Sequence, residues 1–299
     1  MIKKLTIALF SLVLFTTACK KSTDTTNPVV PPVNPTLADN DPLLLGNPTE
    51  AATSVSMTQN YLIDQTYYKE AYNSVRGIPR WVAWHLQSED QGSTARQGDF
   101  RPDTKLPTSW YQVTASSYST GGQPTFDRGH NCPSGDRTAS IPQNSSTFLM
   151  TNMIPQAPSF NQGTWGTLEN YIRTIVGTNY EAYIYMGNYG QGGVGSNGVT
   201  TQTVDNGNVW VPAQVYKIVV IMPKGTGDLS RIDTSATILA VNMPNSSTVF
   251  PSGSNNAWHN YVTTISSIEQ SLTANGYDAN FLSSVNATVR NYLKTKVYQ

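Results

Sequence analysis

Charged residues are scarce in this chain. They make up 13% of the sequence, and the 19 basic and 19 acidic residues cancel to a net charge of zero. A soluble domain carries about 25% charged residues, so polar uncharged residues take their place here. General binding of a polyanion depends on clustered Lys and Arg. The composition therefore gives no support to general electrostatic binding of nucleic acid, and any phosphate contact must come from a few individually placed arginines.

Residues that form disulfides or bind zinc are also few. The two cysteines are Cys19 and Cys132, and the three histidines are His85, His130 and His259. Their spacing forms no HExxH pattern and is not typical of a zinc site. A Cys19–Cys132 disulfide is possible in an oxidising compartment, but it would tie a flexible segment to the core. His85 and His259 are predicted to be ordinary structural or surface residues.

The apolar run at the start of the chain, residues 5–15, is too short to cross a bilayer comfortably. Lys3 and Lys4 precede it and small residues follow, so residues 1–18 are predicted to be a signal peptide. Residues 16–19 resemble a lipoprotein cleavage box, in which Cys19 becomes the first mature residue and carries lipid. We expect an exported lipoprotein, periplasmic or on the cell surface. The alternative is ordinary cleavage and release as a soluble secreted protein.

Residues 19–47 are rich in Pro, Thr, Asn and Asp, which predicts a disordered, solvated tether. The remainder, residues 48–299, is predicted to be one folded domain. Apolar residues make up 38% of the chain and aromatic residues 10%, enough to fill one sizeable core.

Hydrophobic patterns within residues 48–299 predict an α+β fold. Strands are expected at 67–72, 80–86, 147–153, 180–186, 209–222 and 237–242, and helices at 162–176, 259–274 and 285–297. The strand at 80–86 is apolar on both faces and is predicted to be central. Trp165 belongs to an apolar stripe at helical spacing, so it is assigned to the core. The order of elements predicts a mixed, largely antiparallel sheet flanked by helices.

The stretch of residues 126–173 holds side chains suited to phosphodiester hydrolysis. Residues 127–130 read DRGH, residues 152–156 read NMIPQ, and residues 160–169 follow the pattern FNxGxWxxLE. Histidine can take a proton from the attacking water near neutral pH. Arginines or a divalent cation can stabilise the charge on the phosphate oxygens, and a metal can neutralise the leaving oxygen. A single neutral amide oxygen, with waters completing the shell, suits a hard cation such as Mg²⁺.

With these motifs the chain resembles the DNA/RNA non-specific endonuclease family of the ββα-metal superfamily. Endonuclease G-like nucleases belong to this family. Residues 79–83 and 96–103 also match, and the resemblance covers most of residues 60–250. It implies an α+β fold with a ββα-metal active-site motif. It also implies a metal-dependent enzyme that hydrolyses phosphodiester bonds in DNA and RNA, with Mg²⁺ as cofactor and Mn²⁺ as a substitute.

The resemblance also implies a role for each matching residue. His130 would be the general base, and Asn161 would be the one direct protein ligand to the metal. Glu169 would orient a metal-bound water, and the phosphates would be contacted by Arg96, Arg128 and Arg173. Asp127 and Asp136 match positions whose roles are either structural or to support the residues that contact the metal, and no chemistry is assigned to them.

Simpler readings exist for several of these residues. Asn161 stands where a helix N-cap is expected, and Glu169 and Arg173 have the spacing of a surface ion pair. Arg101 competes with Arg96 for its role. The alternative function is a catalytically retired surface lipoprotein that binds a polyanion or a protein partner. A retired enzyme would have no need to keep its full set of active-site residues, so the presence of all four favours the enzyme. These four residues are His130, Asn161, Glu169 and Arg128.

Overall fold

The computed structural model describes residues 37–120 and 123–299. The predicted signal peptide, Cys19 and most of the predicted tether lie outside these residues, so the lipid anchor stays a prediction. No helix in the described part of the chain is both long and apolar enough to span a membrane.

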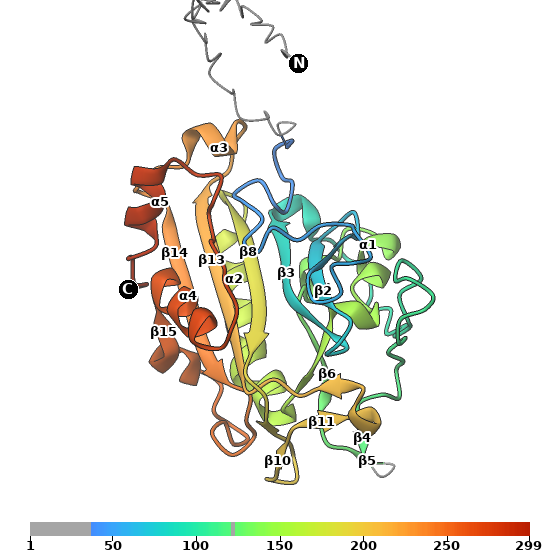
Figure 1. Cartoon of the computed structure of the whole chain (residues 1–299). Helices are drawn as coiled ribbons and strands as arrows, with labels where there is room; N and C mark the ends of the chain where they lie inside the picture. Colours follow the sequence, from blue (N-terminus) through green and yellow to red (C-terminus); the bar gives the residue numbers. More distant parts are fainter. Residues whose placement is uncertain (1–36, 121–122) are drawn as a thin grey trace, which may run out of the picture. The chain divides into compact units, whose positions relative to one another are not determined.

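A seven-stranded sheet forms the centre of the described part of the chain (Figure 1). All its strand pairs are antiparallel. In spatial order the strands are β1 (Tyr61–Asp64), β2 (Lys69–Asn73), β3 (Ile78–Leu86), β8 (Tyr180–Tyr189), β13 (Gln214–Pro223), β14 (Thr237–Pro244) and β15 (Val262–Thr263). β3 lies inside the sheet between β2 and β8, as its two apolar faces predicted.

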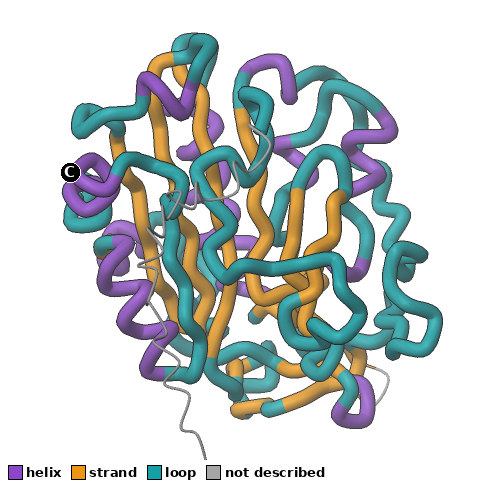
Figure 2. Tube along the Cα trace, turned by 45° about the horizontal axis from the view of Figure 1, so that its top comes forward, coloured by secondary structure: helices purple, strands orange, loops and turns teal. Residues whose placement is uncertain are grey.

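Helices cover both faces of this sheet, as Figures 1 and 2 show. α2 (Gly166–Val176) packs on one face through Leu168, Ile172 and Val176. The other face is covered by α4 (Ile265–Ala274) and α5 (Ala287–Leu293). Two shorter helices are α1 (Ile141–Ser146) and α3 (Asp228–Arg231). The predicted α+β class, an antiparallel sheet flanked by helices, is confirmed.

A small ββα unit lies on the α2 side of the sheet. β6 (Asp127–His130) pairs antiparallel with β7 (Met153–Gln156), and the chain then enters a π-helical turn, Phe160–Trp165, that leads into α2. Met153 and Ile154 of β7 belong to the same buried cluster as Leu168 of α2. The remaining strand pairs are β4 (Ser119–Thr120) with β5 (Gln123–Pro124), β9 (Gly193–Val194) with β10 (Thr200–Thr201), and β11 (Thr203–Val204) with β12 (Val209–Trp210).

Several predicted elements differ from the structure. Residues 147–153 are not a strand, because α1 and a 3₁₀ turn, Met150–Asn152, precede β7. The Ser140 hydroxyl caps α1, a polar helix that hydrophobic patterns miss. The predicted strand 209–222 is interrupted between β12 and β13, where Pro212 lacks the N–H that a ladder needs.

The two helices predicted at the C-terminal end are shorter in the structure. The predicted helix 259–274 begins only at Ile265, because Val262–Thr263 pairs with β14 as β15 and Thr264 caps the helix. The predicted helix 285–297 is confined to α5.

The packed part of the chain begins earlier than residue 48. Leu43, Leu44 and Leu45 are 6%, 3% and 0% exposed and join the core on the α4 side. The Asp41 carboxylate lies 2.7 Å from the Lys69 ammonium. The prediction of a tether reaching residue 47 is therefore wrong for these leucines, because three apolar residues in a row gain more from burial than the polar residues around them lose.

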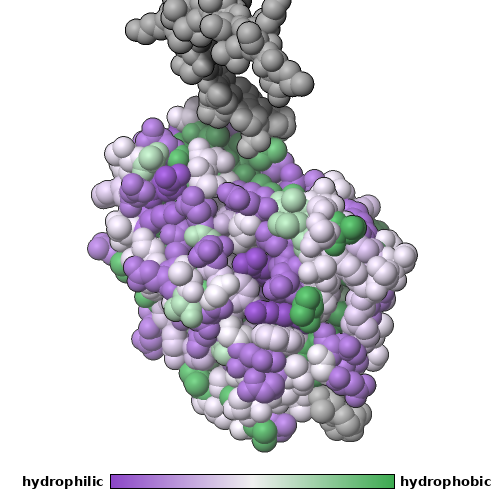
Figure 3. All heavy atoms as spheres, viewed as in Figure 1, coloured by the Kyte–Doolittle hydropathy of each residue, from purple (hydrophilic) through white to green (hydrophobic). Residues whose placement is uncertain are grey.

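Hydrophilic and neutral residues cover most of the face seen in Figure 3, which is the face of α4 and α5. Hydrophobic residues occur there in small scattered groups. This surface fits a composition in which uncharged polar residues replace charged ones.

Candidate active site

His130 is the last residue of β6 and is only 9% exposed. Two aromatic rings, Phe100 and Phe148, meet its imidazole edge to face, with centroids 5.7 Å and 5.0 Å away. Its Nε2 atom is buried and has no hydrogen-bond partner among the described residues. Two aromatic rings therefore pack against the imidazole, and Nε2 is left without a partner in this part of the chain.

The surroundings of His130 keep its imidazole neutral. Burial lowers its pKa to about 3, and the positive charges of Arg96 and Arg128 add to this effect. A neutral imidazole can accept a proton, which a general base must do.

A pocket of about 620 Å³ opens beside His130. His130 itself does not line the pocket, but Phe100 does, and the Phe100 ring contacts the imidazole. The other lining residues include Arg96, Arg128, Asn161 and Gln162. The polar lining residues thus come from the loop before β4, from β6 and from the π-helical turn before α2. The structure brings together in one pocket residues that are far apart in the sequence.

The guanidinium groups of Arg96 and Arg128 lie over aromatic rings of this pocket. Arg96 is 4.8 Å from the Phe148 ring centroid and donates to the Ser134 hydroxyl at 2.5 Å. Arg128 is 4.0 Å from the Phe100 centroid. Neither arginine forms an ion pair with any carboxylate that the structure describes, so both keep donors available for a phosphate.

Arg101, the alternative to Arg96 for contacting the phosphate, does not line the pocket and makes its contacts outside it. Its guanidinium forms an ion pair with Asp99 at 2.7 Å and donates to the Ser145 carbonyl at 3.0 Å. The geometry therefore favours Arg96 as the arginine of the pocket.

Asn161 is not a helix N-cap, which corrects the simpler reading of this residue. It lies inside the π-helical turn, and its backbone N–H donates to the Ala157 carbonyl at 2.8 Å. Its side-chain Nδ2 donates to Asp127 Oδ2 at 2.8 Å, and Gln162 Nε2 donates to the same oxygen at 2.9 Å. Because Asp127 holds the amide nitrogen, the Oδ1 oxygen of Asn161 remains available. π-helical turns of this kind occur frequently at functional sites.

Glu169 and Arg173 do not form the surface ion pair that their spacing allowed. Glu169 Oε1 lies 3.4 Å from the Lys217 ammonium. Arg173 Nη1 lies 2.7 Å from Asp136 Oδ1. Burial raises the pKa of Glu169, and the charges of Lys217 and Arg173 oppose that effect. The charge of Glu169 also raises the pKa of Arg96 against the lowering by burial, so α2 and the pocket arginine are electrostatically linked.

Arg173 is largely occupied by structural contacts. Besides the Asp136 pair, its Nη2 donates to Asn170 Oδ1 at 2.5 Å. The Asp136 carboxylate accepts a second bond, from Trp84 Nε1 at 2.9 Å. Asp136 therefore joins α2 to β3, in line with the structural role that the resemblance implied for it.

The NMIPQ motif holds the loop that follows His130. Asn152 Oδ1 accepts from the Cys132 N–H at 2.9 Å, and Asn152 Nδ2 donates to the Cys132 carbonyl at 2.9 Å. Gly129 allows the close approach of β7, because a Cβ there would lie 2.2 Å from Gln156 Oε1. Cys132 itself is fully buried and free among the described residues, a poor position for a disulfide to a distant tether.

The sequence interpretation missed Lys217, Phe100 and Phe148. Lys217 had a usable signal, because it interrupts the buried, β-branched strand β13, where a charge needs a partner. The two phenylalanines carry no such signal, since their rings meet His130 only in three dimensions.

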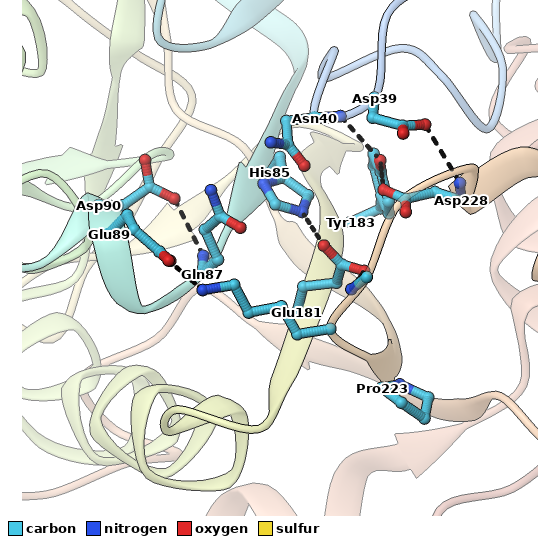
Figure 4. A network of polar contacts seen from close by, with 12 residues as sticks. Asp39, Asn40, His85, Gln87, Glu89, Asp90, Glu181, Tyr183, Pro223 and Asp228 are labelled. Atoms are coloured by element: carbon cyan, nitrogen blue, oxygen red, sulfur yellow. Dashed lines mark hydrogen bonds and ion pairs between the residues drawn. The ribbon is translucent and has the colours of Figure 1, made fainter.

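A second polar cluster lies on the other face of the sheet, around His85 (Figure 4). His85, Glu181 and Asp228 are buried and place ligand-type atoms within 4.8 Å of one another. Arg231 already forms ion pairs with both Glu181 and Asp228, and the Tyr183 hydroxyl donates to Asp228. The Arg231 guanidinium already supplies a positive charge to these carboxylates. We therefore assign the cluster a structural role, as predicted for His85.

Comparison with known proteins places these observations in a family context. The family described as DNA/RNA non-specific endonuclease matches residues 46–288. A nuclease of Nostoc sp. is 40% identical over 255 residues, covering 85% of each chain. Nuclease C1 of Cunninghamella echinulata is 31% identical over 175 residues, covering 56% of this chain and 68% of that protein. A chain in the crystal structure of the EndoG/EndoGI complex shares the fold with a TM-score of 0.63 at 21% identity, covering 83% of this chain and 92% of its own.

Proposed function

The chain belongs to the DNA/RNA non-specific endonuclease family, and from this premise we propose that it hydrolyses phosphodiester bonds in DNA and RNA with His130 as general base. The observation that supports this most directly is the state of His130: it is buried and neutral, and across residues 37–120 and 123–299 its Nε2 has no partner and the two arginines beside it have no carboxylate partner. Such an imidazole can take the proton of an attacking water. Arg96 and Arg128 bind the phosphate and stabilise the charge that develops on its oxygens.

Asn161 and Glu169 fit a hard divalent cation. The Asn161 amide nitrogen is bound to Asp127, which leaves its oxygen as the ligand, and the Glu169 carboxylate can accept from waters around the ion. Mg²⁺ is the proposed ion and Mn²⁺ a substitute; when bound, it would neutralise the leaving 3′ oxygen. Asp127 orients the ligand amide, and Phe100 and Phe148 limit water around His130.

The test is the degradation of plasmid DNA and of RNA by the purified protein in Mg²⁺, with and without chelator. We expect cleavage of both substrates that chelator stops. A protein that binds polyanions without cutting them would leave both substrates intact at every metal concentration, and this result would favour the retired lipoprotein.

We also propose that the chain is exported and anchored through lipid on Cys19. The polar, Pro-rich residues 20–36 would then separate the anchor from the folded domain. A chain starting at Asp39 should be soluble, folded and active, since it keeps the buried residues Leu43, Leu44 and Leu45. Mass spectrometry of the mature protein tests the anchor, because a free N-terminus beyond Cys19 is incompatible with it.

A further inference from the structure

Lys217 lies in the middle of β13 and is buried, with a side chain only 1% exposed. The strand around it is apolar, and its neighbours on the same face, Val215 and Val219, belong to the core beneath α2. A charged side chain in such a place is costly unless it is paired. A methionine or leucine would serve the core better, so this ammonium group needs an explanation.

The Lys217 ammonium group contacts two indole rings and the carboxylate of Glu169, a residue of the proposed active site. Its Nζ atom lies 4.6 Å from the Trp165 ring centroid and 5.4 Å from the Trp84 centroid. The one carboxylate within ion-pair distance among the described residues is Glu169, with Oε1 at 3.4 Å. Two indole rings therefore fix the position of the ammonium group, and the ammonium group fixes one oxygen of Glu169.

No other cation of the described chain lies within ion-pair distance of Glu169. Arg173, one helical turn on, is taken up by Asp136 at 2.7 Å. Asp136 in turn accepts from the Trp84 indole, the same ring that lies beside Lys217. Trp84 thus contacts a member of each pair, and so links the Lys217–Glu169 pair to the Arg173–Asp136 pair.

We propose that Lys217 is a positioning residue for the metal site: by holding Glu169 Oε1, it turns the other carboxylate oxygen toward the hydration shell of the cation. This inference rests on the proposed function. It requires Lys217 to act through Glu169 and not through general stability of the core. Outer partners of metal sites typically influence metal affinity or activity about 10- to 100-fold.

The test is a double-mutant cycle of Lys217→Met and Glu169→Gln, read by Mn²⁺ binding. Methionine is an unbranched side chain one atom shorter than lysine, so it fills most of the same space in the core but removes the charge. Free Mn²⁺ is measured by electron paramagnetic resonance, alongside the Mn²⁺ concentration for half-maximal cleavage and the thermal unfolding curve. Lys294→Met is the matched control, because it removes a Lys–Glu ion pair of 2.7 Å that lies between α4 and α5.

We expect Lys217→Met to weaken Mn²⁺ binding about ten-fold. In the Glu169→Gln background the same change should add no more than about two-fold, because the two residues act as one unit. Lys217→Arg, which keeps the charge, should bind Mn²⁺ more tightly than Lys217→Met. Lys294→Met should leave Mn²⁺ binding unchanged.

Two results would overturn the inference. Unchanged or tighter Mn²⁺ binding by Lys217→Met would mean that the ammonium only repels the cation or fills space. Independent, additive losses in the double variant would mean that Lys217 does not act through Glu169. If Lys217→Met fails to fold, Lys217→Gln enters the same cycle. A wild-type protein that neither binds Mn²⁺ nor cleaves would refute the proposed function itself, whereas an active wild type with an additive cycle refutes the role of Lys217 alone.

Discussion

Two buried histidines lie on opposite faces of the central sheet, in contrasting surroundings. His85 is 3% exposed, and its Nε2 lies 3.2 Å from Glu181 Oε2 within a cluster completed by Arg231. His130 is 9% exposed, but its Nε2 has no partner in the described chain, and the charges nearest to it are the guanidinium groups of Arg96 and Arg128. One histidine is part of a network of paired charges, and the other lies beside two arginines that form no ion pair within the described residues.

This contrast shows which kind of cluster points to function. By residue type, His85, Glu181 and Asp228 look more like a metal site than the pocket around Asn161 does. Yet every carboxylate of the His85 cluster already has a positive or hydroxyl partner. Leaving a buried donor or acceptor unpaired costs about 1–3 kcal/mol. An imidazole nitrogen without a partner, beside two arginines that pair with no carboxylate of the described chain, is therefore the stronger indication of a site that meets its partners in a substrate.

The largest expected effect is the loss of cleavage in His130→Ala. A positioned general base contributes typically about 10²–10⁴-fold, so activity should fall at least a hundred-fold. Folding and DNA affinity should remain close to wild type, since His130 Nε2 has no hydrogen-bond partner within the described protein. Initial rates on plasmid DNA, gel-shift binding and thermal unfolding measure the three quantities. Retention of more than about a tenth of the activity would contradict the assignment of the base.

The next effect concerns the metal. Asn161→Ala should abolish metal-dependent cleavage, because it removes the one direct ligand. Glu169→Ala should raise the metal requirement and lower the rate less completely, because its carboxylate acts through water. Mg²⁺ titrations of the rate test both variants, and roughly millimolar metal is expected for the wild type from so sparse a ligand set. A crystal structure with Mn²⁺ bound to His130, or to two or more carboxylates, would refute this ligand arrangement.

The sequence identified the family more accurately than it located the helices and strands that carry the motifs. The DRGH and FNxGxWxxLE motifs identified the family, which the match over residues 46–288 confirms. Hydrophobic alternation located β3, β8, β13 and β14 to within a few residues at most of their ends. Such patterns depend on which side chains are buried, and these long central strands are buried on both faces.

What could not be predicted depends on contacts between distant residues. Asn161 is not an N-cap because it lies inside the π-helical turn, and its amide nitrogen binds Asp127, 34 residues earlier. Glu169 and Arg173 separate because Lys217 and Asp136 are nearer to them than they are to each other. Leu43, Leu44 and Leu45 pack because the far face of the sheet offers them a surface. None of these partners is visible in a local window of sequence.

A third prediction concerns the His85 cluster, in which Arg231 pairs with two carboxylates. Arg231→Met should destabilise the protein by about 3–5 kcal/mol, because it leaves the buried Glu181 and Asp228 carboxylates without their cation. The cleavage rate of the protein that remains folded should equal that of the wild type within about two-fold. Urea unfolding gives the first quantity, and initial rates at low temperature give the second. A loss of activity with unchanged stability would assign the His85 cluster a functional role and break the contrast between the two histidines.

The smallest expected effect is the dependence of stability on pH that His130 causes. The folded state lowers the pKa of His130 to about 3, whereas an unfolded chain titrates near about 6.5. Below that value the unfolded state binds a proton that the folded state does not, so stability falls as pH falls. The contribution is fully present above about pH 6.5 and is lost at up to about 1.4 kcal/mol per pH unit on the way down.

His130→Gln cannot titrate and serves as the reference for this effect. Between about pH 6.5 and 4.5, wild-type stability should fall relative to His130→Gln by about 2–3 kcal/mol. Urea unfolding at several pH values measures the difference, because all other titrating groups are shared by the two proteins. NMR of the imidazole, assigned by its absence in His130→Gln, should show a neutral ring throughout this range. A ring that titrates between pH 6 and 7 would mean that a counterion reaches His130 in the free enzyme, and the two histidines would then be alike.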